Sequence, residues 1–455
     1  MPPAIATDVD FVLRLAKRDA IKSNHGIVEA EHFVRALYST SETLLPQAID
    51  GQANPVLEPV TADKDDDNDT SHATISPHFQ LVLDNAVNMT LTEQLSTEAV
   101  VFSILMNNGK QKEKPLALLS PTAGAKKEEP SRRAIVGPVD AQVMPRFGGA
   151  PTFARLPRLD QVTFCDVAIL GLPYDSGCTY RPGARFGPSA VRQASRILRP
   201  YHTTLKVNAF HDQQCVDAGD VCCNPFNVTE TMTTVVDHVS ELLQLPSRPR
   251  IVAVGGDHSI SYPLLKAHCE AYGPVALVHF DAHLDTWDAY FGETHTHGTP
   301  FLRAAEEHLF RPDASMHVGI RGPVYSSDDY ARDATLGFSM LNMDAIEDMG
   351  VAGVVKQIRD RVGQHPIYLS IDIDVLDPAF APGTGTPEAG GLSTRELFGM
   401  LRGLRGLNVV GADVMEVAPA YDHAEITALA AASIVFELIS LMATSSAKIL
   451  SATCV

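Results

Sequence analysis

The 455-residue sequence predicts a three-layer α/β domain with a mostly parallel sheet, preceded by a small all-α domain. Three apolar, β-branched runs, at residues 251–254, 275–280 and 367–371, are typical of buried strands. A polar cluster containing Asp follows each run at once. Because ligands bind beyond the carboxyl ends of the strands in open α/β sheets, these clusters predict a functional site at one edge of the sheet.

The first part of the chain carries the residue spacing of amphipathic helices. Apolar residues within 11–38 recur at helical intervals and predict two helices, and a second helical pair is predicted over 79–106. The string Glu31–Leu37 weakly resembles the paired-helix repeat of the Clp chaperone N-terminal domain. We therefore expect residues 1–107 to form a helical domain. The similarity of Ser96–Ala99 to Val28–Glu31 predicts a degenerate repeat, and the helical pairs suggest a protein-binding role.

We expect residues 108–134 to be a linker and residues 135–455 to be the catalytic domain. The composition of the chain excludes several classes of binding partner. The net charge of −19 argues against nucleic acid or an anionic membrane as a partner. No apolar run approaches the ~20 residues that span a bilayer. The 7 cysteines are odd in number and lack CxxC spacing, as expected of thiols in a reducing compartment. With no secretory pattern at the N-terminus, we expect a cytoplasmic protein.

The polar clusters at the strand ends contain the side chains of a metal site. They lie at Gly255–Ser259, Asp281–Asp285 and Ser370–Asp374. One such cluster alone is equally typical of a turn, but three at successive strand ends would bury unpaired charge at a large energetic cost. Four Asp and two His are too many ligands for one tetrahedral zinc ion and suit two octahedral ions. The oxygen-rich set favours Mn²⁺, with Ni²⁺ as the alternative. The sequence thus predicts a two-metal hydrolase.

Several motifs occur in a characteristic order along the predicted catalytic domain. They are GLPYDSG (171–177), RPGARFGPSAVR (181–192), GGDHS (255–259), HFDAHLDTWD (279–288), THGTPF (296–301), SIDIDVLDP (370–378), GTGTPEAGGLS (383–393) and DVMEVAPAYD (413–422). This set resembles the ureohydrolases, the family of arginase, agmatinase and the guanidino-acid hydrolases. The resemblance covers about residues 150–450, is closer to agmatinase than to arginase, and implies the arginase-like αβα fold.

The resemblance also implies a role for each ligand. Asp281 and Asp372 would bridge two ions, which activate a water to attack the guanidinium carbon of the substrate. His297 matches the proton-shuttle position of the family, and an imidazole has a suitable ordinary pKa. The implied ligands of one ion are His258, Asp281, Asp285 and Asp372, and those of the other are His283, Asp281, Asp372 and Asp374.

Four further residues are candidates for substrate binding. Glu416 matches the acid that pairs with the guanidinium, a planar cation best oriented by a bidentate carboxylate. Glu388 either lines the site or holds a loop, and the structural role is slightly favoured. Arg181 would favour a substrate with a carboxylate tail, whereas Trp287 would narrow the pocket.

The function expected from the sequence is hydrolysis of a guanidino compound to urea and an amine, and that compound is the expected small-molecule partner. Candidate substrates are agmatine, 4-guanidinobutyrate, 3-guanidinopropionate, arginine and free guanidine. The alternatives are a formimidoyl-amide hydrolase on the same fold and an inactive regulatory homologue. The resemblance further implies a homo-oligomer, a trimer or a hexamer.

Overall fold

The computed structural model describes residues 134–444 and two short strands nearer the N-terminus. The chain divides into two units, residues 1–128 and 129–455. In the first unit, β1 (Ile27–Val28) pairs in parallel with β2 (Thr74–Ile75), a feature that the prediction of an all-α domain did not include. The helices and repeat predicted within residues 1–107, and the linker up to residue 133, lie outside the described residues.

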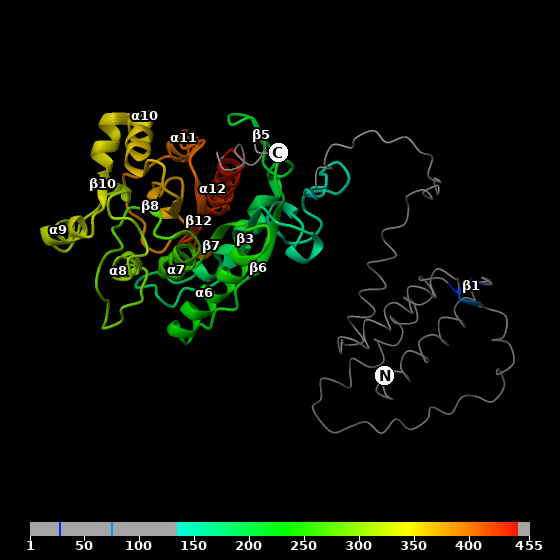
Figure 1. Cartoon of the computed structure of the whole chain (residues 1–455), viewed down its shortest axis with the longest axis horizontal. Helices are drawn as coiled ribbons and strands as arrows, with labels where there is room; N and C mark the ends of the chain where they lie inside the picture. The colour runs from blue at the N-terminus through cyan, green and yellow to red at the C-terminus, as the bar shows by residue number, and fades with distance from the viewer. Residues whose placement is uncertain (1–26, 29–73, 76–133, 445–455) are drawn as a thin grey trace, which may run out of the picture. The chain divides into compact units, whose positions relative to one another are not determined.

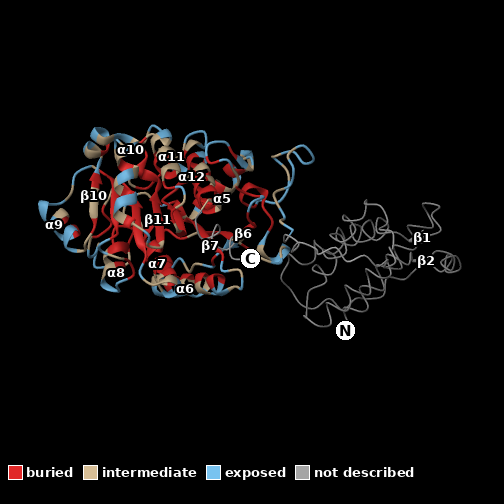
Figure 2. Cartoon of the chain, turned by 45° about the horizontal axis from the view of Figure 1, so that its top comes forward, coloured by how far each residue is buried: buried red, intermediate tan, exposed pale blue. Residues whose placement is uncertain are grey.

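An eight-stranded sheet forms the centre of the second unit. Its strand order is β10-β9-β8-β11-β12-β7-β3-β6, and every neighbouring pair runs in parallel, which confirms the predicted α/β fold. The inner strands are buried on both faces, as expected for a parallel sheet covered by helices, whereas the edge strands β6 and β10 contain half-buried and exposed residues (Figure 2). They are β3 (Val167–Leu172), β6 (Cys215–Asp220), β7 (Arg250–Gly255), β8 (Ala276–Phe280), β9 (Met316–Ile320), β10 (Ser339–Asn342), β11 (Ile367–Asp372) and β12 (Val409–Met415).

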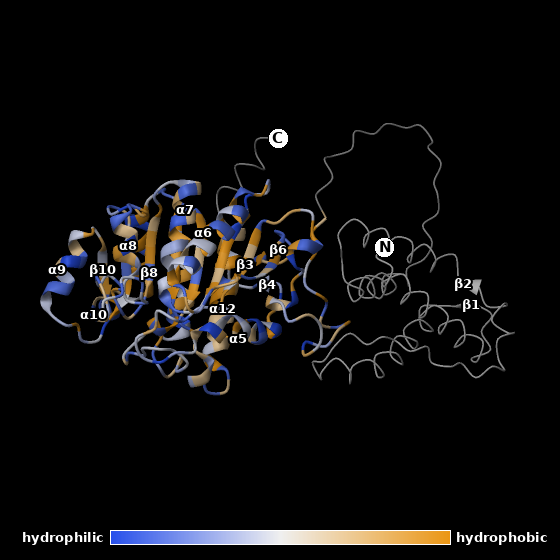
Figure 3. Ribbon diagram, turned by 90° about the horizontal axis from the view of Figure 1, so that it is seen from below, coloured by the Kyte–Doolittle hydropathy of each residue, from blue (hydrophilic) through white to orange (hydrophobic). Residues whose placement is uncertain are grey.

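Helices cover both faces of this sheet (Figure 1). Apolar side chains of α6, α7 and α8 pack on one face, and those of α5, α10, α11 and α12 pack on the other. Hydropathy is highest along the strands between these two layers (Figure 3). The helices are α5 (Gly187–Ala194), α6 (Val228–Gln244), α7 (Ser261–Tyr272), α8 (Pro300–Glu306), α9 (Ser327–Thr335), α10 (Met343–Val362), α11 (Thr394–Gly403) and α12 (Ile426–Ala443).

The last helix corrects one expectation from the sequence. By length and composition α12 is apolar enough to cross a membrane, with a mean hydropathy of 2.1 over 18 residues. No such run was expected from the sequence. Of this window 72% is buried, and α12 packs against β12, α5 and α11, as a core helix does.

A hairpin of β4 (Tyr201–His202) and β5 (Val207–Asn208) is attached to α12 by a buried histidine–carboxylate contact. His202 Nε2 lies 2.8 Å from Glu437 Oε2, and Arg402 of α11 binds the same carboxylate. The His202 ring also stacks on Phe436, with the ring centroids 5.6 Å apart. These contacts connect three elements on the helix layer that contains α12.

The chain order places four strands together at the middle of the sheet. After β7 the chain passes through α7 to β8, and β11 and β12 later occupy the positions between them. The register pairs Phe280 with Ile371, and it pairs Val414 with Val254. The residues that follow β8, β11, β12 and β7 therefore emerge at one level on the same edge of the sheet.

Candidate metal centre

All six predicted metal ligands and both predicted catalytic residues lie at this edge. Asp281 follows β8, Asp372 ends β11, Glu416 follows β12, and His258 lies three residues beyond the end of β7. Asp257 and Asp372 each accept a hydrogen bond from the backbone N–H two residues on, and so begin the short 3₁₀ turns His258–Ile260 and Ile373–Val375. These turns aim side chains into the space beyond the strands.

Close backbone approach explains why glycine precedes this site. A Cβ on Gly256 would lie 1.6 Å from the carbonyl oxygen of Tyr174. The backbone N–H of Glu416 donates to the Gly256 oxygen at 2.8 Å. Any side chain at this position would therefore separate the loop after β7 from the segment after β3.

One imidazole nitrogen faces three carboxylates. His258 Nδ1 lies 3.1 Å from Oδ2 of Asp285, 3.1 Å from Oδ2 of Asp372 and 3.2 Å from Oδ2 of Asp281. A single N–H can donate well to only one of these oxygens, so the arrangement has more acceptors than protons. Convergence of one nitrogen and three oxygens on a point is the geometry expected around a cation.

The second imidazole faces the other side of Asp281. His283 Nδ1 lies 3.3 Å from Oδ1 of Asp281 and 3.1 Å from Oδ2 of Asp374. The two carboxylate oxygens of Asp281 thus face different histidines, as a carboxylate shared by two ions would. Apart from this contact with His283, Oδ2 of Asp374 is buried without a hydrogen bond, whereas Oδ1 accepts from the Ala282 N–H at 3.2 Å.

The buried carboxylates carry more negative charge than the described protein groups neutralise. Burial, with the charges of Asp374 and Asp281, raises the pKa of Asp372 well above its ordinary value. Burial and the nearby Asp281 raise the pKa of Asp374 to about 6. Burial also opposes ionisation of Asp281, but neighbouring imidazoles outweigh it and hold that pKa well below its ordinary value. Divalent cations would stabilise all of these charges together.

The far side of His258 is held by a polar network. Its Nε2 lies 2.9 Å from the Ser370 hydroxyl, which donates to Asp413 Oδ1 at 2.7 Å. Asp413 Oδ2 also accepts from the hydroxyls of Tyr368 and Ser261. Ligating histidines usually have such a partner on the second nitrogen, because it fixes the ring and its tautomer.

Two acidic residues of the site adopt strained backbone conformations. Asp285 has φ 55° and Glu416 has φ 64°, a region that residues other than glycine seldom occupy. Such strain is concentrated at functional sites, where the surrounding contacts maintain it. In Glu416, Oε1 accepts the His258 backbone N–H at 2.8 Å, whereas Oε2 is buried without a partner.

His297 lies between Glu416 and the loop after β3. Its Nδ1 is 3.3 Å from Glu416 Oε1, and its Nε2 is 2.7 Å from the Thr179 hydroxyl. Burial lowers the affinity of the ring for a proton, but Glu416 outweighs this effect and raises the pKa of His297 to about 9. Asp257 holds the loop in place by accepting the Gly177 N–H at 2.7 Å. Thr179 is a contact that the sequence analysis did not identify, since it depends on how this loop folds over the site.

A cavity of about 410 Å³ opens beside the cluster. Trp287 forms part of its wall, and the Trp287 ring lies 6.1 Å from the rings of Tyr290 and Tyr325. Glu388 also lines the cavity, and its backbone oxygen holds the Arg321 side chain, so it has both of the roles considered for it. The lining residues are Thr179, His283, Asp285, Trp287, Tyr290, His297, Gly298, Pro323, Val324, Tyr325, Asp372, Thr386 and Glu388.

Arg181 does not line this cavity. Its guanidinium lies 5.3 Å from the ring centroids of Tyr180 and Tyr421, outside the set of lining residues. The described lining contains no Lys or Arg. The Arg181 side chain is therefore not among the residues that line the cavity, although its backbone oxygen, like Glu416 Oε2, lies close to Gly385.

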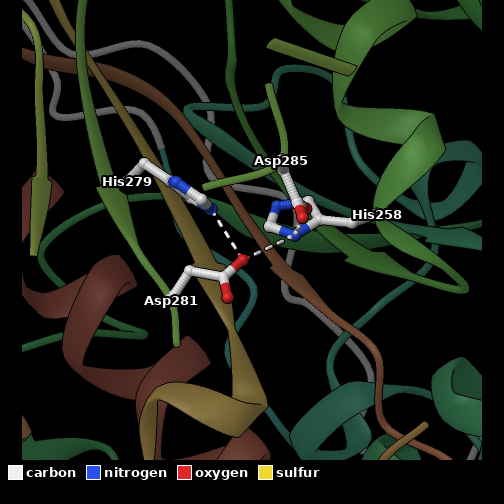
Figure 4. A group of neighbouring side chains, drawn as sticks. All are labelled: His258, His279, Asp281 and Asp285. Carbon is white, nitrogen blue, oxygen red and sulfur yellow. Dashed lines mark hydrogen bonds and ion pairs between the residues drawn. The ribbon is translucent and has the colours of Figure 1, made fainter. Parts of the chain in front are cut away.

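A third histidine, His279, also lies at the cluster, with Nε2 2.8 Å from Asp281 Oδ2 (Figure 4). The four groups His258, His279, Asp281 and Asp285 are close enough to share a metal ion. His279 was not among the residues predicted from the sequence to lie in the site. Its position two residues before Asp281 puts it on the same side of β8, which is the signal that could have drawn attention to it.

Comparison with known proteins gives four consistent findings. Residues 165–440 match the model of the arginase family. An agmatinase of Chromobacterium violaceum is 41% identical over 300 residues, which cover 65% of this chain and 89% of that protein. The structure of proclavaminate amidino hydrolase from Streptomyces clavuligerus is 44% identical with a TM-score of 0.63, and the match covers 66% of this chain and 99% of that one. A Trypanosoma cruzi formiminoglutamase, solved with two Mn²⁺ ions, is 26% identical with a TM-score of 0.56 over 62% of this chain and 94% of that one.

Proposed function

The chain belongs to the arginase family of hydrolases, and on this premise we propose that it cleaves a guanidino C–N bond to release urea and an amine. The observation that carries the proposal is the buried, unpartnered Oε2 of Glu416, which lies next to His297 and the acidic cluster. An unpaired buried carboxylate oxygen is costly in the absence of a cation. A guanidinium would supply two N–H groups in the plane that a carboxylate accepts best.

The donor set fits two divalent ions. His258, Asp281, Asp285 and Asp372 would hold one ion, and His283, Asp281, Asp372 and Asp374 would hold the other. When bound, two such ions make a water acidic enough to serve as a nucleophile near neutral pH. Mn²⁺ is our first choice because the set is rich in carboxylate oxygen, and Ni²⁺ is the alternative.

The remaining site residues orient the substrate and move a proton. Glu416 fixes the guanidinium plane and so presents the central carbon to the ions. His297 holds a proton at neutral pH because of its raised pKa. It can pass this proton to the amine nitrogen as the C–N bond breaks, since an unprotonated amine is a poor leaving group. Thr179 holds the ring at Nε2 while this takes place.

The cavity wall indicates which substrate tails are favoured. Its aromatic rings suit the methylene groups of an extended tail, and Glu388 adds a negative charge whose one described ionic contact is His283 Nε2 at 4.0 Å. No described Lys or Arg in the lining would pair with a carboxylate tail. We therefore expect agmatine to be hydrolysed with a higher kcat/KM than 4-guanidinobutyrate.

The test is an assay of urea release from protein loaded with Mn²⁺, with Ni²⁺, and stripped of metal. Agmatine, 4-guanidinobutyrate, 3-guanidinopropionate, arginine and guanidine form the substrate panel. We expect urea only from metal-loaded protein. Release of formamide from a formimidoyl amide, with no urea from any guanidino compound, would establish the alternative reaction instead.

A further inference from the structure

A chain of buried polar contacts leads away from the metal centre behind Asp281. His279 Nε2 lies 2.8 Å from Asp281 Oδ2, and its Nδ1 lies 2.7 Å from Nδ1 of His317. His317 Nε2 in turn lies 3.1 Å from Asp333 Oδ1. The chain thus runs from β8 through β9 to α9. None of His279, His317 and Asp333 has a part in the reaction proposed above.

These groups have little access to water. The exposed fraction is 0% for His279 and His317 and 2% for Asp333. Phe301 lies 4.3 Å from the His279 ring, and Phe338 lies 4.0 Å from the His317 ring, measured between centroids. Each polar atom therefore depends on the next one in the chain, because an unpaired group in such surroundings is costly.

The contacts fix where the protons lie. Asp281 must accept if it is to remain an anionic ligand, so His279 donates from Nε2 and its Nδ1 accepts from His317. His317 then donates from Nδ1, and its Nε2 lies against Asp333 Oδ1 on the other side of the ring.

We propose that His279, His317 and Asp333 are positioning residues that hold the Asp281 carboxylate in the orientation that bridges two ions. The contact with His279 fixes Oδ2, which leaves Oδ1 directed to His283. Asp333 also accepts from the Thr286 hydroxyl at 3.1 Å, so the same carboxylate steadies the residue after Asp285. The inference rests on the proposed metal centre, and it adds a requirement for α9 at that centre.

The alternative role for His279 is that of a direct metal ligand, as its place in Figure 4 allows. Both of its nitrogens are already engaged, one by Asp281 and one by His317. His258 differs, because its Nδ1 faces three carboxylates at once. The hydrogen bonding therefore favours His258 as the metal ligand, and it favours His279 as the residue that positions Asp281.

The experiment is a titration of metal-free full-length protein with Mn²⁺. The chain has 1 tryptophan, Trp287, which lines the cavity, so its fluorescence reports binding without a label. The variants are His317→Phe, His279→Phe and the milder Asp333→Asn, which keeps an acceptor but removes the negative charge. The matched control is His202→Phe, because His202 is buried to a similar degree and forms a His–carboxylate pair of its own with Glu437. Thermal unfolding of each metal-free protein is recorded in parallel.

We expect the Kd for Mn²⁺ to rise by about 10- to 100-fold in His317→Phe and by less in Asp333→Asn, as is typical for groups that orient a ligand. His202→Phe should keep the parental Kd even if it unfolds at a lower temperature. A parental Kd for Mn²⁺ in both His317→Phe and Asp333→Asn would overturn the proposed positioning role. An equal loss of affinity in His202→Phe would overturn it as well. Saturation of His279→Phe at one ion, with His317→Phe unaffected, would show His279 to be a ligand. If the parent protein itself binds no divalent ion, the proposed function fails as well.

Discussion

Glu416 is the residue at which backbone strain, burial and an unsatisfied oxygen coincide. Its conformation at φ 64° is maintained by the Gly256 carbonyl and by the His258 N–H, so the carboxylate is fixed before any substrate arrives. Gly385 leaves room beside it, since a Cβ there would lie 3.4 Å from Oε2. A fixed anion loses little entropy on binding, which is how a preorganised site improves affinity.

Glu416→Gln should therefore weaken the binding of the guanidinium without emptying the metal centre. Loss of a charge-assisted hydrogen bond costs about 1.5–3 kcal/mol, so we expect kcat/KM to fall by roughly 10- to 150-fold. Steady-state kinetics and metal analysis give the two readouts. Glu425→Gln is the control, because Glu425 also has a positive φ, of 60°, but is exposed, whereas Glu416 is buried beside His297. Unchanged kinetics in Glu416→Gln would refute its role.

The pKa of His297 gives a prediction about pH. In the free protein Glu416 raises this pKa to about 9, so the ring is protonated below that pH and loses its proton above it. A bound guanidinium would occupy Glu416 and lower the pKa. The fall of kcat at high pH should therefore begin at a lower pH than the fall of kcat/KM, because kcat reports the complex and kcat/KM the free enzyme.

His297→Gln should abolish the fall of both kcat and kcat/KM at high pH. It should also lower kcat by about 10²- to 10⁴-fold while the metal is retained. His295→Gln is the control, since His295 is two residues away and does not line the cavity. A profile in His297→Gln that still falls near pH 9 would assign the titration to another group.

At the scale of elements, the centre depends on the carboxyl ends of neighbouring parallel strands. The apolar runs at 251–254, 275–280 and 367–371 predicted β7, β8 and β11 closely, because a strand buried on both faces is apolar throughout. β9 was not predicted, since His317 and Gly319 interrupt its apolar pattern. The contact of His279 with His317 could not be predicted either, because it joins β8 to β9 and the sequence does not show that these strands are neighbours.

Substitution of a ligand shared by both ions should remove more metal than substitution of a ligand that binds one ion. Asp281→Ala and Asp372→Ala should each lose both ions and all urea release, because each removes a bridge. His258→Ala should retain about one equivalent, at the site formed around His283. Metal analysis by mass spectrometry after dialysis distinguishes these patterns. Two ions still bound in either Asp variant would contradict the assigned bridges.

At the scale of the whole molecule, all the site residues come from one unit of the chain. They lie between residues 179 and 416, within the unit 129–455. Its described N-terminal end is attached by Val136, whose backbone N–H and C=O both bond the Gln214 side chain, at 2.8 and 2.9 Å. The sequence placed the start of the catalytic domain at residue 135, one residue before this contact.

A protein that starts at Glu129 should therefore fold, bind two ions and release urea with the parental kcat. Activity and metal content of this truncation and of the full chain provide the comparison. A second truncation that starts at Pro138 removes Val136, and we expect it to unfold at a lower temperature with similar kcat. A soluble, metal-loaded but inactive 129–455 protein would mean that residues 1–128 help to shape the active site.

The placement of β11 and β12 between β7 and β8 has a consequence for how the protein is made. When the ribosome has completed β10, it has already released β7 and β8. The strands that lie between them in the sheet, β11 and β12, fall within residues 367–415 and are still unsynthesised. Pairing across so great a sequence separation is slow, and the unpaired edges are prone to association in the meantime. Glu416 is then one of the last site residues to emerge. The nascent chain therefore gains its ion-binding pocket and its protection from aggregation in a single late step, which makes this enzyme a candidate for chaperone assistance during synthesis.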